Sequence, residues 1–316
     1  MNRKNKRVLI AGGAGFVGSH LCCQLVDKGY NVICIDNLST GRIKNIANIM
    51  KCPNFEFVQR DIVGSVAIDG DIDEIYHLAS PASPLQYQLN PIHTFQTNVI
   101  GALNLLELAQ QKGSRILLAS TSEVYGDPTQ HPQKEDYWGN VNPNGIRSCY
   151  DEGKRSAETL FCDYHRMHGV DVRIVRIFNT YGPNMSKEDG RVVSNFITQA
   201  LKNEPITING DGNQTRSFQY IDDLIVGILQ VMEDGVPCVP INIGNPQERT
   251  VASLAELIVK LTKSSSMLKY RKLPSDDPKV RCPDITRART FLRSWQPMVD
   301  IEQGLSLTIE YFKNEL

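Results

Sequence analysis

Tyr150 and Lys154 are the two residues whose types and spacing most directly suggest chemistry. Four positions apart on a helix, their side chains lie on one face. An ammonium group beside a phenol favours the phenolate, so we expect Tyr150 to act as a base well below its usual pKa of about 10. The same spacing also occurs in ordinary surface contacts, so the interpretation depends on the elements that position the pair.

A glycine-rich turn near the start of the chain provides that context. Gly12, Gly15 and Gly18 follow a short apolar strand and lead into a helix expected over residues 19–28. Such glycines let the backbone approach a pyrophosphate, and the helix N-terminus offers N–H donors and a positive dipole end. Asp36 ends the next strand, where a carboxylate can bind an adenosine ribose. This order of features predicts a dinucleotide-binding site.

The acid at position 36 favours NAD over NADP, because a carboxylate would repel the 2′-phosphate of NADP. Arg42 offers a charge that would soften this preference. A solvated loop charge is an equally good interpretation of Arg42. The sequence therefore predicts NAD as the cofactor.

The chain alternates strands and helices, which predicts an α/β fold with a doubly wound, parallel Rossmann sheet. The expected strands after the first are 32–35, 55–58, 75–78, 116–119 and 172–177, and the expected helices are 97–111, 153–168, 192–202, 253–262 and 301–312. We expect an NAD-binding domain over residues 1–180, to which 214–245 return, and a smaller α/β substrate-binding lobe over 181–316. Asp222 and Asp223 are expected to cap a further helix.

Composition limits the class of protein. A formal net charge of −1 over 316 residues gives no electrostatic basis for binding nucleic acid or an anionic membrane. No apolar run approaches the roughly 20 residues of a membrane span, and the basic start at residues 3–7 lacks the features of a signal peptide. We therefore expect a cytoplasmic protein.

The eight cysteines include no C-x-x-C pair, so reduced and mostly buried thiols are expected. Cys149, beside Tyr150, is the one candidate nucleophile, but core packing is the better interpretation. His165 and His168 lack a carboxylate or cysteine at metal-ligand spacing, so the sequence predicts no metal site.

Motifs along nearly the whole chain resemble the extended short-chain dehydrogenase/reductase family. They are the turn at 12–18, Asp36-Asn37, Asp61-Ile62, His77-Leu78-Ala79, the segment 120–125, Tyr150 with Lys154, and the segment 179–183. The resemblance implies a set of NAD contacts. They are Gly12, Gly15, Phe16, Val17, Asp36, Asn37, Asp61, Ile62, Leu78, Ala79, Ser80, Thr97, Ser120, Tyr150 and Lys154.

Four segments resemble one branch of that family, the UDP-glucuronate decarboxylases. They are residues 77–84, 119–128, 135–139 and 276–284. The resemblance implies that UDP-glucuronate is oxidised at C4, loses CO₂ as a β-keto acid and is reduced to UDP-xylose, with NAD recycled. It also implies a homodimer formed through the helices 97–111 and 153–168.

The same resemblance implies roles for five catalytic residues. Tyr150 would take the proton of the C4 hydroxyl, Lys154 would lower the Tyr150 pKa and bind the nicotinamide ribose, and Thr121 would hydrogen-bond the C4 oxygen. Glu123 would position the sugar ring or manage protonation at C5. Arg281 would grip the glucuronate carboxylate.

Other interpretations stay open at this stage. Without the resemblance, Arg281 would be read as a surface partner of Asp276 or Asp277. The implied substrate contacts are Ser83, Pro84, Thr121, Glu123, Asn179, Arg191, Gln214, Arg216 and Arg281. Gln96 stands where many of these decarboxylases have a basic residue, which puts one further contact in doubt.

Two other functions remain as alternatives. One is a UDP-sugar 4-epimerase or 4,6-dehydratase of the same family, and the other is a non-catalytic NAD-binding protein. Ser122 speaks against the dehydratase, since that reaction needs an acid after the threonine and serine is a poor one.

Overall fold

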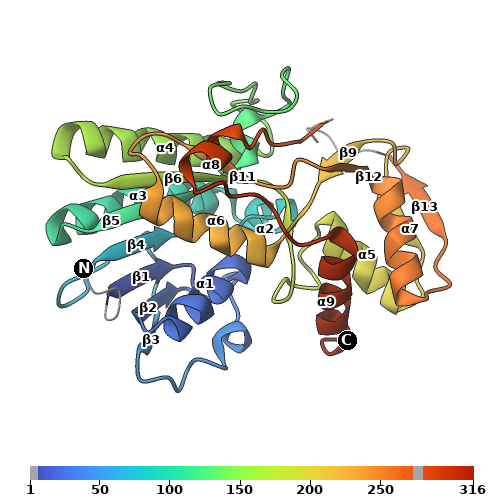
Figure 1. Cartoon of the computed structure of the whole chain (residues 1–316), viewed down its shortest axis with the longest axis horizontal. Coiled ribbons are helices and arrows are strands. Elements are labelled where there is room, and N and C mark those ends of the chain that lie inside the picture. Colours follow the sequence, from blue (N-terminus) through green and yellow to red (C-terminus); the bar gives the residue numbers. More distant parts are fainter. Residues whose placement is uncertain (1–5, 273–279) are drawn as a thin grey trace.

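A seven-stranded parallel sheet forms the centre of the computed structural model, which describes residues 6–272 and 280–316 (Figure 1). The strand order β11-β6-β5-β4-β1-β2-β3 reverses direction between β1 and β4, as in a doubly wound fold. Its strands are β1 (Arg7–Ala11), β2 (Asn31–Asp36), β3 (Phe55–Gln59), β4 (Glu74–His77), β5 (Arg115–Thr121), β6 (Val172–Ile177) and β11 (Ile241–Ile243). The predicted Rossmann sheet is confirmed.

Two layers of helices cover the sheet (Figure 1). The helices α1 (Phe16–Asp27) and α6 (Ile221–Asp234) pack together on one face, and α3 (Pro91–Lys112) and α4 (Ser148–His168) pack together on the other. The inner strands are largely buried on both faces, which explains their apolar sequences, whereas the edge strand β3 is partly exposed. This arrangement leaves the carboxyl ends of the strands free to form a site.

A smaller lobe lies at one end of the sheet, around α5, α7 and α9 (Figure 1). Its helices are α5 (Val192–Leu201), α7 (Val251–Thr262) and α9 (Ile301–Lys313). Its strand pairs are β8 (Ile206–Asn209) with β13 (Leu268–Arg271) and β9 (Thr215–Ser217) with β12 (Glu248–Thr250). Shorter elements are η1 (Ile43–Ile46), α2 (Pro84–Leu89), η2 (Ser122–Tyr125), β7 (Thr180–Tyr181), β10 (Gln219–Tyr220) and α8 (Thr286–Phe291).

Several helices begin earlier than the sequence predicted. Helix α1 begins at Phe16 rather than residue 19, and α4 begins at Ser148 rather than residue 153, so Tyr150 lies in its first turn. Helix α3 begins at Pro91 rather than residue 97, because Asn90 caps it by accepting a 3.1 Å hydrogen bond from the His93 N–H. The cap and the proline were local signals for this start.

The expected capping role of Asp222 and Asp223 is wrong. The residue before α6 is Tyr220, and no side chain caps this helix. Asp223 instead accepts 3.0 Å hydrogen bonds from the backbone N–H groups of Met298 and Val299. It therefore joins the C-terminal segment to α6, a contact that sequence spacing does not reveal.

Candidate active site

A cavity of about 960 Å³ lies between the carboxyl ends of the strands and the smaller lobe. Every residue that the sequence assigned to catalysis, cofactor or substrate lines it. On the strand side these are Gly12, Gly15, Phe16, Val17, Asp36, Asn37, Asp61, Ile62, Leu78, Ala79, Ser80, Ser83, Pro84, Thr97, Ser120, Thr121, Glu123, Tyr150 and Lys154. On the lobe side they are Asn179, Arg191, Gln214, Arg216 and Arg281.

The glycine turn forms one end of the cavity and fits a dinucleotide. Gly12 has φ +83°, and a Cβ atom there would lie 2.7 Å from the Cα of Ala79. At Gly18 a Cβ would lie 2.1 Å from the Gly12 oxygen, so both positions exclude a side chain. The first turn of α1 follows directly, with its free N–H groups at the cavity.

Asp36 lies at the end of β2, as predicted, and is held by the backbone. Its carboxylate accepts hydrogen bonds from Ala14 N–H at 3.0 Å and Leu38 N–H at 2.8 Å. Burial nevertheless raises the pKa of Asp36 above its usual value. Arg42 donates to the Asn184 carbonyl at 2.9 Å and lies 3.9 Å from Glu315, so its interactions join two segments rather than leave it in solvent. This geometry supports the predicted preference for NAD.

Asp61, which lines the cavity near Asp36, accepts hydrogen bonds from three neighbouring residues. Its carboxylate accepts 2.8 Å hydrogen bonds from the Asn37 amide and the His93 ring, and a 2.9 Å bond from Val63 N–H. Burial opposes ionisation, but these donors hold the pKa of Asp61 below its ordinary value. A fixed carboxylate next to Asn37 provides polar groups where an adenine or its ribose would lie.

Tyr150, Thr121 and Lys154 meet at the centre of the cavity. Burial raises the pKa of Tyr150 to about 12, although a hydrogen bond with Thr121 acts in the opposite direction. The Lys154 Nζ lies 5.9 Å from the centre of the Tyr150 ring and donates to the Ala119 carbonyl at 2.8 Å. Burial lowers the pKa of Lys154 to about 7. Desolvation is the largest influence on the Tyr150 pKa, so its net shift is upward rather than downward as expected.

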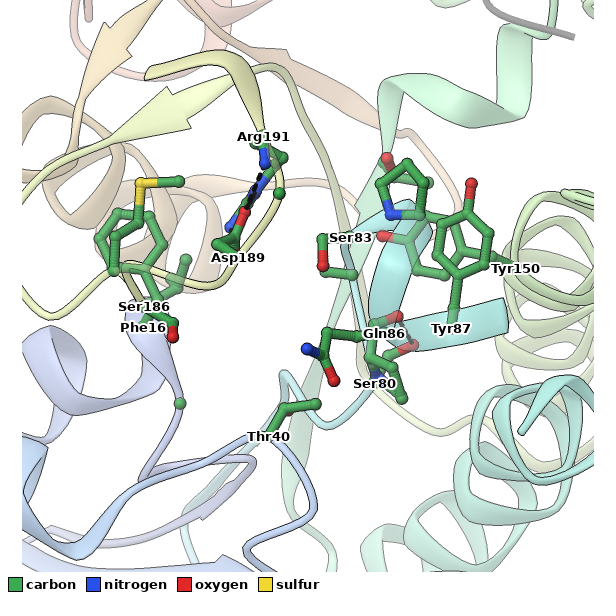
Figure 2. Close-up of a pocket in the computed structure, with 18 of the residues that line it drawn as sticks. Phe16, Thr40, Ser80, Ser83, Gln86, Tyr87, Tyr150, Ser186, Asp189 and Arg191 are labelled. Atoms are coloured by element: carbon green, nitrogen blue, oxygen red, sulfur yellow. Dashed lines mark hydrogen bonds and ion pairs between the residues drawn. The ribbon is translucent and has the colours of Figure 1, made fainter. Parts of the chain in front are cut away.

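Tyr87 stacks on the catalytic candidate Tyr150. The two ring centres lie 5.2 Å apart and the planes differ by 3° (Figure 2). Figure 2 shows both rings on one wall of the cavity, with Arg191 and Asp189 across the open space. The hydroxyl of Tyr87 is buried and has no hydrogen-bond partner among the described residues. It is therefore available to a polar group in the cavity.

Glu123 lies between two guanidinium groups. One carboxylate oxygen accepts a hydrogen bond from Arg281, and the other accepts one from Arg147. Arg147 also lies 3.8 Å from Asp151, and its carbonyl accepts the N–H of Tyr150 at 2.9 Å. The residue that precedes α4 thus holds both Glu123 and the turn that carries Tyr150.

Arg281 is 5% exposed and has one nitrogen, Nη2, with no hydrogen-bond partner among the described residues. Burial lowers its pKa to about 10, so it still carries its charge at neutral pH. The alternative partners Asp276 and Asp277 lie outside the described residues, as does the start of the segment 276–284. A buried cation with an unused donor is suited to bind an anionic group.

The lobe side of the cavity holds further polar groups. Arg191 forms an ion pair with Asp189 at 2.5 Å and lies 6.0 Å from the Phe16 ring. Gln214 donates to the Asn209 carbonyl at 2.5 Å, while its own carbonyl oxygen is buried without a described partner. Cations and amides on this side are suited to a nucleoside diphosphate.

Sequence reasoning missed Tyr87, Arg147 and Asp189. Arg147 precedes Tyr150 by three positions, a spacing that places both on one helix face, so this signal was available. Tyr87 follows Pro84 by three positions in the short helix α2. Asp189 had no signal beyond its closeness to Arg191 in the chain.

Comparison with known proteins agrees with this geometry. Residues 8–244 match the model of the NAD dependent epimerase/dehydratase family, and the chain belongs to that family. A protein of Arabidopsis thaliana named UDP-glucuronic acid decarboxylase 4 is 53% identical over 316 residues, which cover 100% of this chain and 70% of the relative. UDP-glucuronic acid decarboxylase 1 of Danio rerio is 52% identical over 99% of this chain and 74% of its own length.

Solved structures of similar proteins share the fold. A UDP-glucose 4-epimerase of Thermotoga maritima with UDP-glucose superposes with a TM-score of 0.87 at 30% identity, over 98% of this chain and 99% of the other. A UDP-glucuronic acid 4-epimerase of Bacillus cereus, in complex with UDP-glucuronic acid and NAD, gives 0.87 at 29% identity, over 98% and 100%. Among the described residues, no helix combines the length and apolarity needed to cross a membrane.

Proposed function

We propose that the chain is an NAD-dependent decarboxylase that converts UDP-glucuronate to UDP-xylose and CO₂. Similarity to UDP-glucuronic acid decarboxylases at 52–53% identity, over 99–100% of this chain and 70–74% of the relatives, supports this assignment. The observation that carries it is the position of Arg281, which lines the same cavity as Tyr150 and whose buried Nη2 has no hydrogen-bond partner among the described residues. The cavity thus contains both a cation for the sugar carboxylate, Arg281, and a base for the sugar hydroxyl, Tyr150.

The order of steps follows from the stability of the carbanion. Direct loss of CO₂ would leave a C5 carbanion with nothing to stabilise it, whereas a C4 ketone makes the substrate a β-keto acid and the product an enolate. Bound NAD⁺ would supply the acceptor for the C4 hydride and the donor for its return. Gly12, Gly15 and Asp36, at the glycine-turn end of the cavity, and Lys154, at its centre, would hold it.

Tyr150 takes the C4 hydroxyl proton and later gives it back. Thr121, which shares a hydrogen bond with Tyr150, holds the C4 oxygen in line with the phenol. Lys154 binds the nicotinamide ribose, and its charge would offset part of the burial that raises the Tyr150 pKa. Tyr150, Thr121 and Lys154 thus orient the sugar and transfer its C4 hydroxyl proton.

Arg281 and Glu123 act on the carboxyl end of the sugar. The Arg281 Nη2 binds the carboxylate and holds the bond between C5 and the carboxylate carbon perpendicular to the plane of the C4 carbonyl. The electron pair of this bond then enters the enolate as CO₂ leaves. Glu123, fixed by Arg281 and Arg147, lies next to this carboxylate and directs the proton that arrives at C5. The uridine diphosphate lies toward Asn179, Arg191, Gln214 and Arg216, while Ser83 and Pro84 border the sugar.

Incubation of purified protein with UDP-glucuronate and NAD⁺, followed by mass and NMR analysis of the sugar nucleotide, tests the proposal. We expect UDP-xylose and CO₂ with no net change in NAD. Formation of UDP-galacturonate would favour a 4-epimerase instead, as in the Bacillus cereus neighbour. Unchanged UDP-glucuronate would contradict the decarboxylase assignment.

We further propose a homodimer through the outer faces of α3 and α4. Helix α3 exposes apolar side chains there, with Phe95 40% and Ile100 37% exposed. Light scattering on a sizing column should show a dimer, and Ile100→Glu should shift it toward monomer. Val226→Glu is the matched control, since Val226 is 46% exposed on α6 at the opposite face of the sheet.

Two smaller proposals concern organisation and location. We propose that residues 1–180 and 214–245 form the NAD-binding domain and that the rest of 181–316 forms the substrate lobe, which is supported by the place of β11 in the main sheet. We also propose a cytoplasmic location, supported by eight free cysteines.

A further inference from the structure

Three side chains from distant parts of the chain converge outside the catalytic centre. The ligand-capable atoms of His131, Glu248 and Cys282 all lie within 4.8 Å of one another. The His131 Nε2 is 2.9 Å from a carboxylate oxygen of Glu248. The side chains of His131 and Glu248 are 39% and 27% exposed, while Cys282 is 5% exposed. The group therefore has an open side and a closed side.

Hydrogen bonds from neighbouring backbone fix two of the three segments to each other. The N–H of Gln133 donates to the Cys282 carbonyl at 2.8 Å, and the Cys282 N–H donates to the Gln133 side chain at 2.8 Å. The N–H of Asp284 donates to the Gln133 carbonyl at 2.9 Å. The stretch that bears His131 is thus joined to the stretch that bears Cys282 by three bonds.

The third segment is held just as firmly. Glu248 begins β12, which pairs with β9, and its second carboxylate oxygen accepts a 2.6 Å hydrogen bond from Thr215 of β9. One oxygen of Glu248 is therefore oriented by the sheet, and the other points to His131. A ligand that is already oriented by an outer hydrogen bond is typical of metal sites.

We propose that His131, Glu248 and Cys282 form a site for a divalent cation of the zinc class, with solvent in the fourth position. Imidazole nitrogen, thiolate sulfur and carboxylate oxygen are the ligands that Zn²⁺ takes, whereas Mg²⁺ and Ca²⁺ prefer oxygen alone. Bond lengths of about 2.0 to 2.3 Å put tetrahedral ligands roughly 3.5 Å apart, so a small side-chain movement closes the group around an ion. The ion would replace the proton between His131 and Glu248 and the proton of the thiol.

Binding at this site would affect catalysis through Arg281, a step that rests on the proposed function. Cys282 follows Arg281 directly, and the Arg281 carbonyl accepts a 3.4 Å hydrogen bond from Ser217 of β9. An ion that draws the sulfur toward His131 would shift the backbone that aims Arg281 at Glu123. We therefore expect the bound ion to inhibit decarboxylation.

Titration of chelator-treated protein with Cd²⁺ tests the site without using activity. We expect one equivalent per chain, with the ultraviolet absorption of a thiolate–cadmium bond, and competition by Zn²⁺. Cys282→Ser should remove the absorption, and Cys52→Ser, at a half-buried cysteine outside the group, should keep it.

His131→Gln provides a second variant at an exposed position, where folding is not at risk. It should weaken Cd²⁺ binding at least about tenfold and relieve inhibition by Zn²⁺, while metal-free turnover stays at the wild-type rate. Binding by His131→Gln as tight as wild type would overturn the site. Tight binding by wild type with no loss of turnover would overturn the coupling to Arg281. Lack of turnover in metal-free protein would count only against the proposed function.

Discussion

Arg281 donates a hydrogen bond to Glu123 across 158 positions of the chain and keeps its Nη2 free for another acceptor. The pair lies in the same cavity as Tyr150 and Lys154. Glu123 holds Arg281 through Nη1 only. Nη2 of the same guanidinium can therefore bind a second carboxylate. If Arg281 binds the substrate carboxylate, as we propose, this relationship would favour sugar acids over neutral hexoses.

Replacement of Arg281 by alanine should lower kcat/KM for UDP-glucuronate by at least ~100-fold, or about 2.7 kcal/mol. The reason is that the substrate carboxylate and Glu123 would then lie together without a cation between them. Steady-state assays of CO₂ release measure the loss, and NAD⁺ affinity by calorimetry should stay at the wild-type value. An Arg281→Ala variant with normal turnover would exclude the proposed role.

Arg147 should act as a positioning residue, since it contacts Glu123 and the first turn of α4. We expect Arg147→Gln to lower kcat about tenfold with little change in the affinity for NAD⁺, because Glu123 would turn entirely to Arg281 and occupy its free nitrogen. Arg147→Lys should recover part of the rate by restoring a single charged donor. Single-turnover NMR gives the readout. If both variants lose stability and NAD⁺ binding equally, the role of Arg147 is only structural.

The glycine turn, Asp36 and the Tyr150–Lys154 spacing could be predicted because they depend on residues close together in the chain. Glu123 between Arg147 and Arg281 could not, since this contact depends on how η2, the start of α4 and the segment after β13 meet. The pKa of Lys154 was also out of reach, because the sequence shows its neighbour Tyr150 but not its burial. Motifs of neighbouring residues predict where helices, strands and candidate site residues lie. The pKa values and contacts of those residues depend on burial and on residues distant in the chain.

Cofactor choice should depend on the charge of Asp36. Asp36→Asn should weaken NAD⁺ binding and strengthen NADP⁺ binding, and the ratio of the two Kd values should shift about tenfold or more, as expected for loss of a charged hydrogen bond. Calorimetric titration with each cofactor measures this, with Asp27→Asn, at an exposed position at the end of α1, as the control. An unchanged ratio would contradict the assignment of Asp36 to the ribose.

Burial of Lys154 should also make the free energy of unfolding depend on pH. Its pKa is about 7 in the folded protein and about 10.4 in an unfolded chain. Below about pH 7 both states hold the proton, so folding carries the whole cost of a buried ammonium group. Between those two values only the unfolded state holds the proton, so the free energy of unfolding rises with pH.

Lys154→Met removes this dependence along with the charge. It should therefore stabilise the protein most at about pH 6 and less at about pH 9, with a difference of roughly 2 kcal/mol between the two. Urea unfolding at both pH values measures it, and Lys51→Met, at an exposed lysine, should give no such difference. The variant should also lose nearly all turnover, because Tyr150 and the nicotinamide ribose would lack their cation. An equal change in stability at both pH values would mean that Lys154 folds with its proton in place.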